Sequence, residues 1–124
     1  MKIVRFEDIE AWQLARELTR KVYRLTKKPG FAKDYGLKKQ IQDAAGSSMH
    51  NIAEGFDSET NAEFIRFLRY AKRSCTEVQS ELYVALDEEY ISLTNSKMFT
   101  SRPDEHVPLF VDSSTILKNM KSAK

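Results

Sequence analysis

The chain has 124 residues, 41% hydrophobic and 31% charged, which predicts one domain with a single core and much solvated helix surface. Twenty basic and eighteen acidic side chains give a net charge of +2, which excludes a histone-like polycation but permits a local basic patch. Four glycines and three prolines are too few for a β-sandwich, and one cysteine excludes a disulfide framework or a Cys-based metal site. No apolar run approaches the ~18 residues of a membrane span, and the acidic start is unlike a signal peptide, so we expect a cytoplasmic protein.

Apolar residues recur every three or four positions over residues 7–28, which predicts an amphipathic helix. Its core stripe is Ala11, Leu14, Ala15, Leu18, Val22 and Leu25. Asp8 is placed to cap the helix or to favour its positive end. Pro29 and Gly30 then end the helix.

The same periodicity predicts a second helix over residues 34–56. Its apolar face is formed by Leu37, Ile41, Ala44 or Ala45, Ser48 and Ile52. The middle of this helix, residues 44–48, contains only Ala, Gly and Ser, so another helix can approach closely. Gly55 is the expected C-terminal breaker.

A third helix is expected over residues 61–89, and Thr60 with Glu63 forms a capping-box pattern at its start. Its core stripe is Phe64, Phe67, Leu68, Ala71, Cys75, Val78, Leu82, Ala85 and Leu86. Turns of about five residues make consecutive helices antiparallel neighbours. The predicted fold class is therefore all-α, an up-down antiparallel bundle, with residues 1–96 forming three long helices.

The last 28 residues, 97–124, differ in character from the rest of the chain. Pro103 and Pro108 forbid one continuous helix, and clean helical periodicity is lost until about residue 114. A fourth helix of the bundle is therefore doubtful in this sequence.

Three segments resemble the bacterial four helix bundle protein family, also called the S23 ribosomal protein or 23S rRNA intervening-sequence protein. The similar residues are FEDI at 6–9 with Trp12, NIAEGF at 51–56, and EFIRFL at 63–68 with Ala71, Ser74 and Glu77. The resemblance covers residues 5–92. It implies a four-helix bundle that assembles into a homopentameric ring, and a gene found inside intervening sequences of large-subunit rRNA. That genomic setting implies rRNA or another structured RNA as a partner.

The family usually ends in a helix that this tail lacks. Back-translating residues 107–124 and reading two nucleotides later can give SFIRGFINYLKKYEECK, which is similar to the missing helix. We advance the hypothesis that a frameshift lies between residues 95 and 102.

The clearest surface feature is a row of arginines on the first helix. Arg16, Arg20 and Arg24 follow one another at intervals of four, and Lys27 and Lys28 extend their face. Residues 1–30 carry eight basic and four acidic side chains, whereas residues 57–96 carry four basic and eight acidic ones. The near-neutral total therefore hides a polarised molecule.

Trp12 and Tyr23 lie at the border between the apolar stripe and the basic row. Basic side chains beside aromatic rings suit phosphate contact with base stacking. The alternative interpretation is a merely solvated face, with Trp12 packed at an interhelix seam.

The polar members of the family-like segments are Asn51, Glu54, Ser74 and Glu77. Glu54 and Glu77 resemble a paired-carboxylate acid/base site, but a structural role is the preferred interpretation, because polar groups on facing helices fix their register. Cys75 lies on the core stripe without a histidine to activate it. His50 and His106 are the only histidines, and neither follows a Glu by three residues as a helical di-iron site needs, so no metal site and no cofactor are expected.

These observations predict a non-enzymatic, oligomeric scaffold or adaptor that binds structured RNA or an RNA-associated partner through basic helix faces. The alternative is a protein–protein interaction module that binds no nucleic acid. Neither interpretation involves a membrane.

Overall fold

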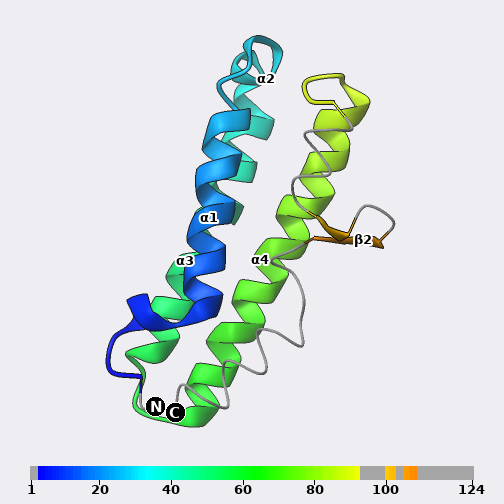
Figure 1. The fold of residues 1–124 in the computed structure, drawn as a ribbon. Coiled ribbons are helices and arrows are strands. Elements are labelled where there is room, and N and C mark those ends of the chain that lie inside the picture. The colour runs from blue at the N-terminus through cyan, green and yellow to red at the C-terminus, as the bar shows by residue number, and fades with distance from the viewer. Residues whose placement is uncertain (1–2, 93–99, 103–104, 109–124) are drawn as a thin grey trace.

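The computed structural model describes residues 3–92, 100–102 and 105–108. Its elements are η1 (Phe6–Asp8), α1 (Glu10–Leu25), α2 (Pro29–Lys33), α3 (Tyr35–Phe56), α4 (Asn61–Asp87), β1 (Thr100–Arg102) and β2 (Glu105–Pro108). The three long helices α1, α3 and α4 run side by side as an elongated antiparallel bundle (Figure 1). The predicted helical bundle is thus confirmed for residues 3–92.

The long helices begin and end within a few residues of the expected bounds, and two of them start at side-chain caps. The Asp34 carboxylate accepts from the Leu37 amide at 3.1 Å, and the Thr60 hydroxyl accepts from the Glu63 amide at 3.1 Å. Asp8 does not cap α1, because it lies in η1 and the helix begins after Ile9 without a side-chain cap.

The end of the first helix also differs from expectation. Helix α1 stops at Leu25, and Pro29 opens the short helix α2 instead of merely ending α1. Proline is tolerated in a first turn because its missing N–H has no intrahelical partner there. The α2 residue Phe31 is fully buried and stacks against Tyr90, whose hydroxyl donates to Asp34 at 2.9 Å. Helix α2 therefore closes one end of the core.

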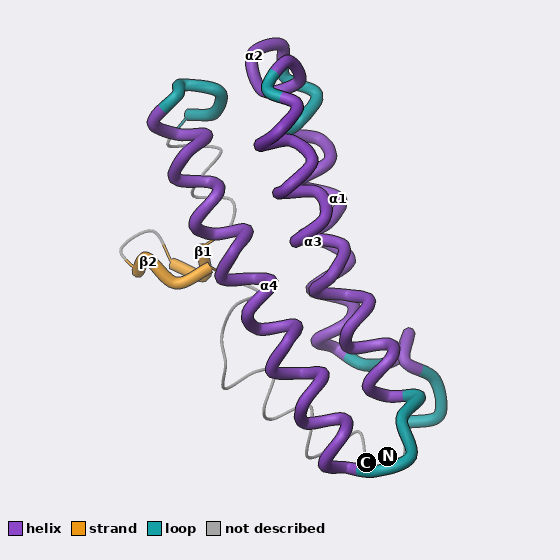
Figure 2. Tube along the Cα trace, turned by 180° about the vertical axis from the view of Figure 1, so that it is seen from behind, coloured by secondary structure: helices purple, strands orange, loops and turns teal. Residues whose placement is uncertain are grey.

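Helix α3 packs against both α1 and α4 (Figure 2). The buried residues of these helices form two clusters, one centred on Leu18, Val22, Ile41 and Val78, and the other on Trp12, Ile52, Phe64 and Leu68. Among the stripe residues expected in the core, Leu14, Phe67 and Leu86 are only half-buried. The apolar stripes otherwise face one another as their periodicity predicts.

Gly55 does not break α3, which corrects the prediction. It lies within the helix and is buried where α4 crosses. A Cβ atom at this position would lie 2.6 Å from the Phe67 Cβ and 3.1 Å from the Phe64 ring. Gly55 is therefore needed for the close approach of the two helices, and α3 ends one residue later at Phe56.

Most of the tail 97–124, and with it the fourth-helix and frameshift hypotheses, lies outside the described residues. Within it, β1 and β2 pair as an antiparallel two-stranded sheet, with Thr100 opposite Pro108 and Arg102 opposite Glu105. Among the described helices, none is both long enough and apolar enough to cross a bilayer.

Candidate nucleic-acid interface

The arginine row, Arg16, Arg20 and Arg24, lies on the solvent side of α1. The Arg20 and Arg24 side chains are 52% and 63% exposed. Each has a guanidinium nitrogen 3.7 Å from a carboxylate oxygen of Glu17, the one acidic residue between positions 11 and 33. Exposed ion pairs with a nitrogen–oxygen distance of 3.7 Å contribute little to stability. Both guanidinium groups can therefore exchange the Glu17 carboxylate for a phosphate.

The row continues past the end of α1. Lys27 and Lys28 are exposed in the turn that leads to α2. Between residues 11 and 33 the sequence holds seven basic side chains against one acidic side chain. Such an excess of positive charge over one segment of the chain creates a positive potential that attracts polyanions.

Of the two interpretations of Trp12, the structure agrees with packing between elements and not with an exposed stacking ring. Its side chain is 9% exposed and belongs to the core, where the Phe6 ring meets it edge-on at 5.2 Å between centroids. The Arg16 guanidinium carbon lies 5.7 Å from the Trp12 ring centroid. The indole thus holds Arg16 in place and has no free face for a base, so the predicted stacking role of Trp12 is corrected.

Tyr23, in contrast, is 47% exposed and lies beside a hollow of about 370 Å³. We call this hollow the α3 groove, and it is lined by Tyr23, Gln42, Asp43, Gly46, Ser47, His50, Asn51 and Glu54. All of these except Tyr23 come from α3. Because Tyr23 follows Arg20 by less than one turn of α1, the groove and the arginine row are neighbouring parts of one surface.

The polar groups of the α3 groove include several acceptors. The Asn51 side-chain amide donates to the Ser47 carbonyl at 2.8 Å and to the Ser47 hydroxyl at 2.9 Å. Lys39 donates to one carboxylate oxygen of Asp43 at 2.7 Å, and this contact raises the pKa of Lys39 above its ordinary value. Glu54 is exposed and makes no ion pair with any described residue. Carboxylate oxygens therefore remain open toward this surface.

The four polar residues of the family-like segments separate into two pairs. Ser74 of α4 reaches α3, where its hydroxyl lies 3.0 Å from the Ser47 hydroxyl, and Asn51 bonds to the same Ser47. Glu54 and Glu77 are both exposed and make no hydrogen bond or ion pair with the described residues. Ser47, which we did not single out from the sequence, thus links Asn51 with Ser74 across the two helices.

Glu81 is a second residue that the sequence reading missed. It is 8% exposed on α4, and its Oε2 atom is buried without a hydrogen-bond partner. Burial, followed by the nearby carboxylates of Glu77 and Asp43, raises its pKa to about 7. In the sequence Glu81 directly precedes the core residue Leu82, so the apolar periodicity alone does not indicate that it is buried.

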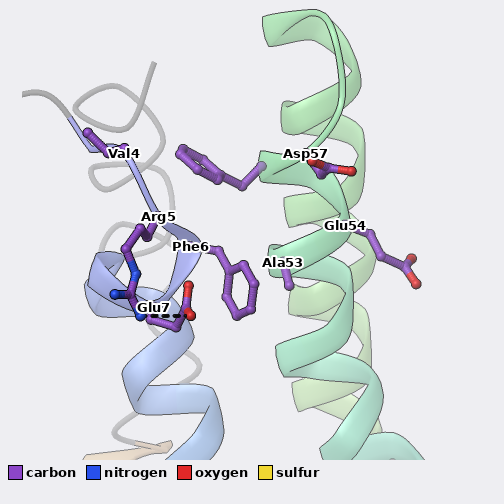
Figure 3. Close-up of a pocket in the computed structure, with 8 residues that line it drawn as sticks. Val4, Arg5, Phe6, Glu7, Ala53, Glu54 and Asp57 are labelled. Atoms are coloured by element: carbon purple, nitrogen blue, oxygen red, sulfur yellow. Dashed lines mark hydrogen bonds and ion pairs between the residues drawn. The ribbon is translucent and has the colours of Figure 1, made fainter.

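An apolar notch lies near the other end of α3, between η1 and the last turn of the helix, with a volume of about 560 Å³. Its lining is Val4, Arg5, Phe6, Glu7, Ala53, Glu54, Phe56 and Asp57. In Figure 3 the Phe6 ring points toward Ala53, whereas Glu54 and Asp57 point away from Phe6. Arg5 pairs with Glu7 at 2.9 Å on one rim of the notch, whereas Glu54 and Asp57 on the other rim make no ion pair with a described residue.

Groups suited to metal or covalent chemistry are few in the described ranges. They contain no cluster of three or more His, Cys, Asp or Glu side chains that could hold a metal ion. Cys75 is buried beside Ser48, and burial raises its pKa to about 12. A thiol with so high a pKa is not a nucleophile at neutral pH.

Comparison with known families gives one match. A family profile described as 23S rRNA-intervening sequence protein matches residues 7–109, which includes the arginine row and the α3 groove. No curated protein matches the sequence.

Proposed function

Since the chain belongs to the 23S rRNA-intervening sequence protein family, we propose that it binds structured RNA as a non-enzymatic scaffold or adaptor. The arginine row supplies the phosphate contacts, with Lys27 and Lys28 extending them. Tyr23 supplies an aromatic face beside the row.

The one observation that supports this site best is the exposure of the arginine row on the outer side of α1, where Glu17 is the one acidic residue between positions 11 and 33. Three guanidinium groups at four-residue intervals on α1 span about 12 Å along the helix. That length matches a few consecutive phosphates of an RNA strand. Arginine is well suited to them because its planar fork donates two parallel hydrogen bonds to one phosphate.

We further propose that the protein acts as a homo-oligomer, as its family resemblance implies. Repeating one modest basic face on several subunits raises the affinity for a large RNA through avidity. Light scattering on the purified protein measures this directly, and a monomeric mass would contradict it.

The function is tested by titrating a labelled RNA stem-loop with the wild type and with the triple charge reversal of Arg16, Arg20 and Arg24 to Glu. We expect the dissociation constant to rise at least tenfold. The slope of log affinity against log salt concentration should decrease by the equivalent of about two to three phosphate contacts. Filter binding at several KCl concentrations gives both quantities.

A matched control reverses three charges on α4, at Arg69, Lys72 and Arg73, which are also exposed. This variant changes the net charge equally, so a generic loss of attraction affects both variants alike. Equal losses in the two variants would contradict a specific site on α1. A protein partner retained at high salt without any RNA would favour the interaction-module alternative.

A further inference from the structure

We propose that the apolar notch between η1 and the end of α3 is a docking site for a basic peptide segment of a partner protein. The segment places one large apolar side chain in the notch and a lysine or arginine against Glu54 and Asp57. None of the residues that line the notch belongs to the arginine row, so the inference goes beyond the proposed function. With both surfaces, one adaptor holds an RNA and a protein.

The walls of the notch are held in place by other parts of the bundle. The Phe6 ring meets Trp12 edge-on at 5.2 Å between centroids, and the Phe56 ring meets Phe64 edge-on at 6.0 Å. The Gln13 side-chain amide donates to a backbone carbonyl of η1 at 3.0 Å, which ties η1 to α1. A hollow whose walls are fixed before binding loses less conformational entropy when a ligand enters.

The notch has room and apolar surface for one side chain of a ligand. Its volume is about 560 Å³, within the ~300–1,000 Å³ usual for ligand pockets. Val4, Phe6, Ala53 and Phe56 supply the apolar walls, and Val4 is 78% exposed. An apolar side chain that enters the notch is favourable because it removes apolar surface of both molecules from water.

The rim on α3 carries negative charge that the protein does not compensate. Glu54 and Asp57 are exposed and make no ion pair with a described residue. They lie at the C-terminal end of α3, which is the negative end of the helix dipole, and the last turn of α3 holds no basic residue.

The charge of the surrounding sequence decides between a protein and a nucleic acid as the ligand. Residues 51–65 include four acidic side chains and no basic one. A negative potential of this kind attracts a lysine or arginine and repels the phosphates of RNA. The chemistry that fits the notch is therefore a basic peptide with an apolar anchor.

The two contacts lie on opposite sides of the end of α3, which sets their spacing in the peptide. In Figure 3 the Phe6 ring points toward Ala53, whereas Glu54 and Asp57 point away from Phe6. A segment that reaches both sides crosses the helix, whose diameter with side chains is ~10–12 Å. An extended peptide advances ~3.3 Å per residue, so its apolar and basic residues should be about three to four positions apart.

The first experiment selects peptides from a random twelve-residue phage-display library on the immobilised protein. We expect the enriched peptides to share a large apolar residue with a lysine or arginine three to four positions away. Enrichment of peptides without a basic residue, or no enrichment over the bare support, would overturn the proposal.

The second experiment measures binding of one enriched peptide, carrying a fluorescent label, by anisotropy. Glu54→Lys with Asp57→Lys reverses the charge of the rim and should raise the dissociation constant by about tenfold, because like charges then face each other. The matched control is Asp87→Lys with Glu88→Lys, which reverses two exposed acidic residues at the C-terminal end of α4. Equal losses in the two variants would show that only the net charge matters, and the notch would be wrong.

Two further variants test the apolar contact. Ala53→Leu fills the hollow, and Val4→Ser removes an exposed apolar wall without reaching the core. Each should weaken peptide binding by about threefold or more. Circular dichroism checks that both variants fold, and Val4→Ser keeps the test decisive if Ala53→Leu disturbs α3. Unchanged binding in a folded Val4→Ser variant would contradict an anchor in the notch.

The last measurements separate this inference from the proposed function and from other occupants. An excess of the RNA stem-loop should not displace the peptide, and displacement would place RNA in the notch instead. A change of oligomeric mass in the rim reversal, measured by light scattering, would show that a second copy occupies the notch. If the arginine reversal abolishes RNA binding while no peptide binds, the proposed function stands and the docking site is wrong. If the peptide binds at the notch and no RNA binds, the docking site stands alone.

Discussion

The outer face of α1 and the seam between α3 and α4 use polar residues in opposite ways. On α1 the arginines extend into solvent, and Arg20 and Arg24 pair with Glu17 at 3.7 Å. At the seam the polar groups bond to one another over short distances, as Ser47 does with Ser74 at 3.0 Å. Glu81 alone among the described residues is left there with a buried polar side-chain atom that has no partner.

This difference separates stability from binding. Side chains enclosed between helices determine how closely the helices pack, so changes at the seam should alter the free energy of unfolding. Side chains that extend from α1 contribute little to folding and remain free to bind a ligand.

The largest effect is expected at Gly55, where the seam is tightest. Gly55→Ala should lower the free energy of unfolding by about 2–3 kcal/mol, because the new methyl group would lie 2.6 Å from the Phe67 Cβ, an atom fixed to the backbone. This loss should appear although alanine favours a helix by about 1 kcal/mol over glycine. Urea denaturation followed by circular dichroism measures the change.

Gly46 supplies the matched control on the same helix. A Cβ atom there meets nothing closer than 3.7 Å, so Gly46→Ala should raise stability by about 0.5–1 kcal/mol through helix propensity alone. Equal effects at the two glycines would show that α3 and α4 do not approach as closely as the structure has them.

The second effect concerns the buried carboxyl of Glu81. Its pKa is raised from 4.5 to about 7, so the folded state binds a proton more tightly than the unfolded state. Stability from this group is fully present below pH 4.5 and is lost as the pH rises through 7. Glu81→Gln should therefore stabilise the protein by about 1–2 kcal/mol at pH 8 and have a much smaller effect at pH 5.

Unfolding curves of the wild type and Glu81→Gln at several pH values test this. Glu77→Gln is the comparison variant, since Glu77 is exposed on the same helix and its charge is a smaller cause of the raised Glu81 pKa than burial, so the pH dependence of stability should change less than in Glu81→Gln. A stability difference that does not change between pH 5 and pH 8 would contradict burial of an ionisable group at the seam.

The sequence predicts the parts of this contrast that depend on periodicity. Apolar spacing indicates the three long helices, and spacing by four places Arg16, Arg20 and Arg24 on the outer face of α1. The Thr60 cap is also correct, because a capping box involves only neighbouring residues. Local patterns of this kind need no knowledge of the partner helix.

What the sequence does not predict depends on contacts between elements. Glycine is a residue type that often ends a helix, so the sequence alone suggests a helix end at Gly55. Only the position of Phe67 on α4 shows that Gly55 is needed for close packing. Trp12 lies at the edge of the apolar stripe, and Phe6 from η1 encloses it. The α3 groove joins Tyr23 to residues 19 to 31 positions later, so the small residues at 44–48 indicate close packing but not the hollow beside it.

The smallest effect on stability is expected on α1, where the effect on binding should be large. The double variant Arg20→Ala and Arg24→Ala removes two contacts of 3.7 Å to Glu17 between side chains that are about half exposed or more. Such pairs contribute little, so the free energy of unfolding should change by less than about 0.5 kcal/mol. RNA affinity should nevertheless fall and depend less on salt, since the variant removes two of the proposed phosphate contacts. Urea denaturation and RNA titration of the same preparation measure both quantities, and a stability loss above 1 kcal/mol would mean that this face belongs to the folding core.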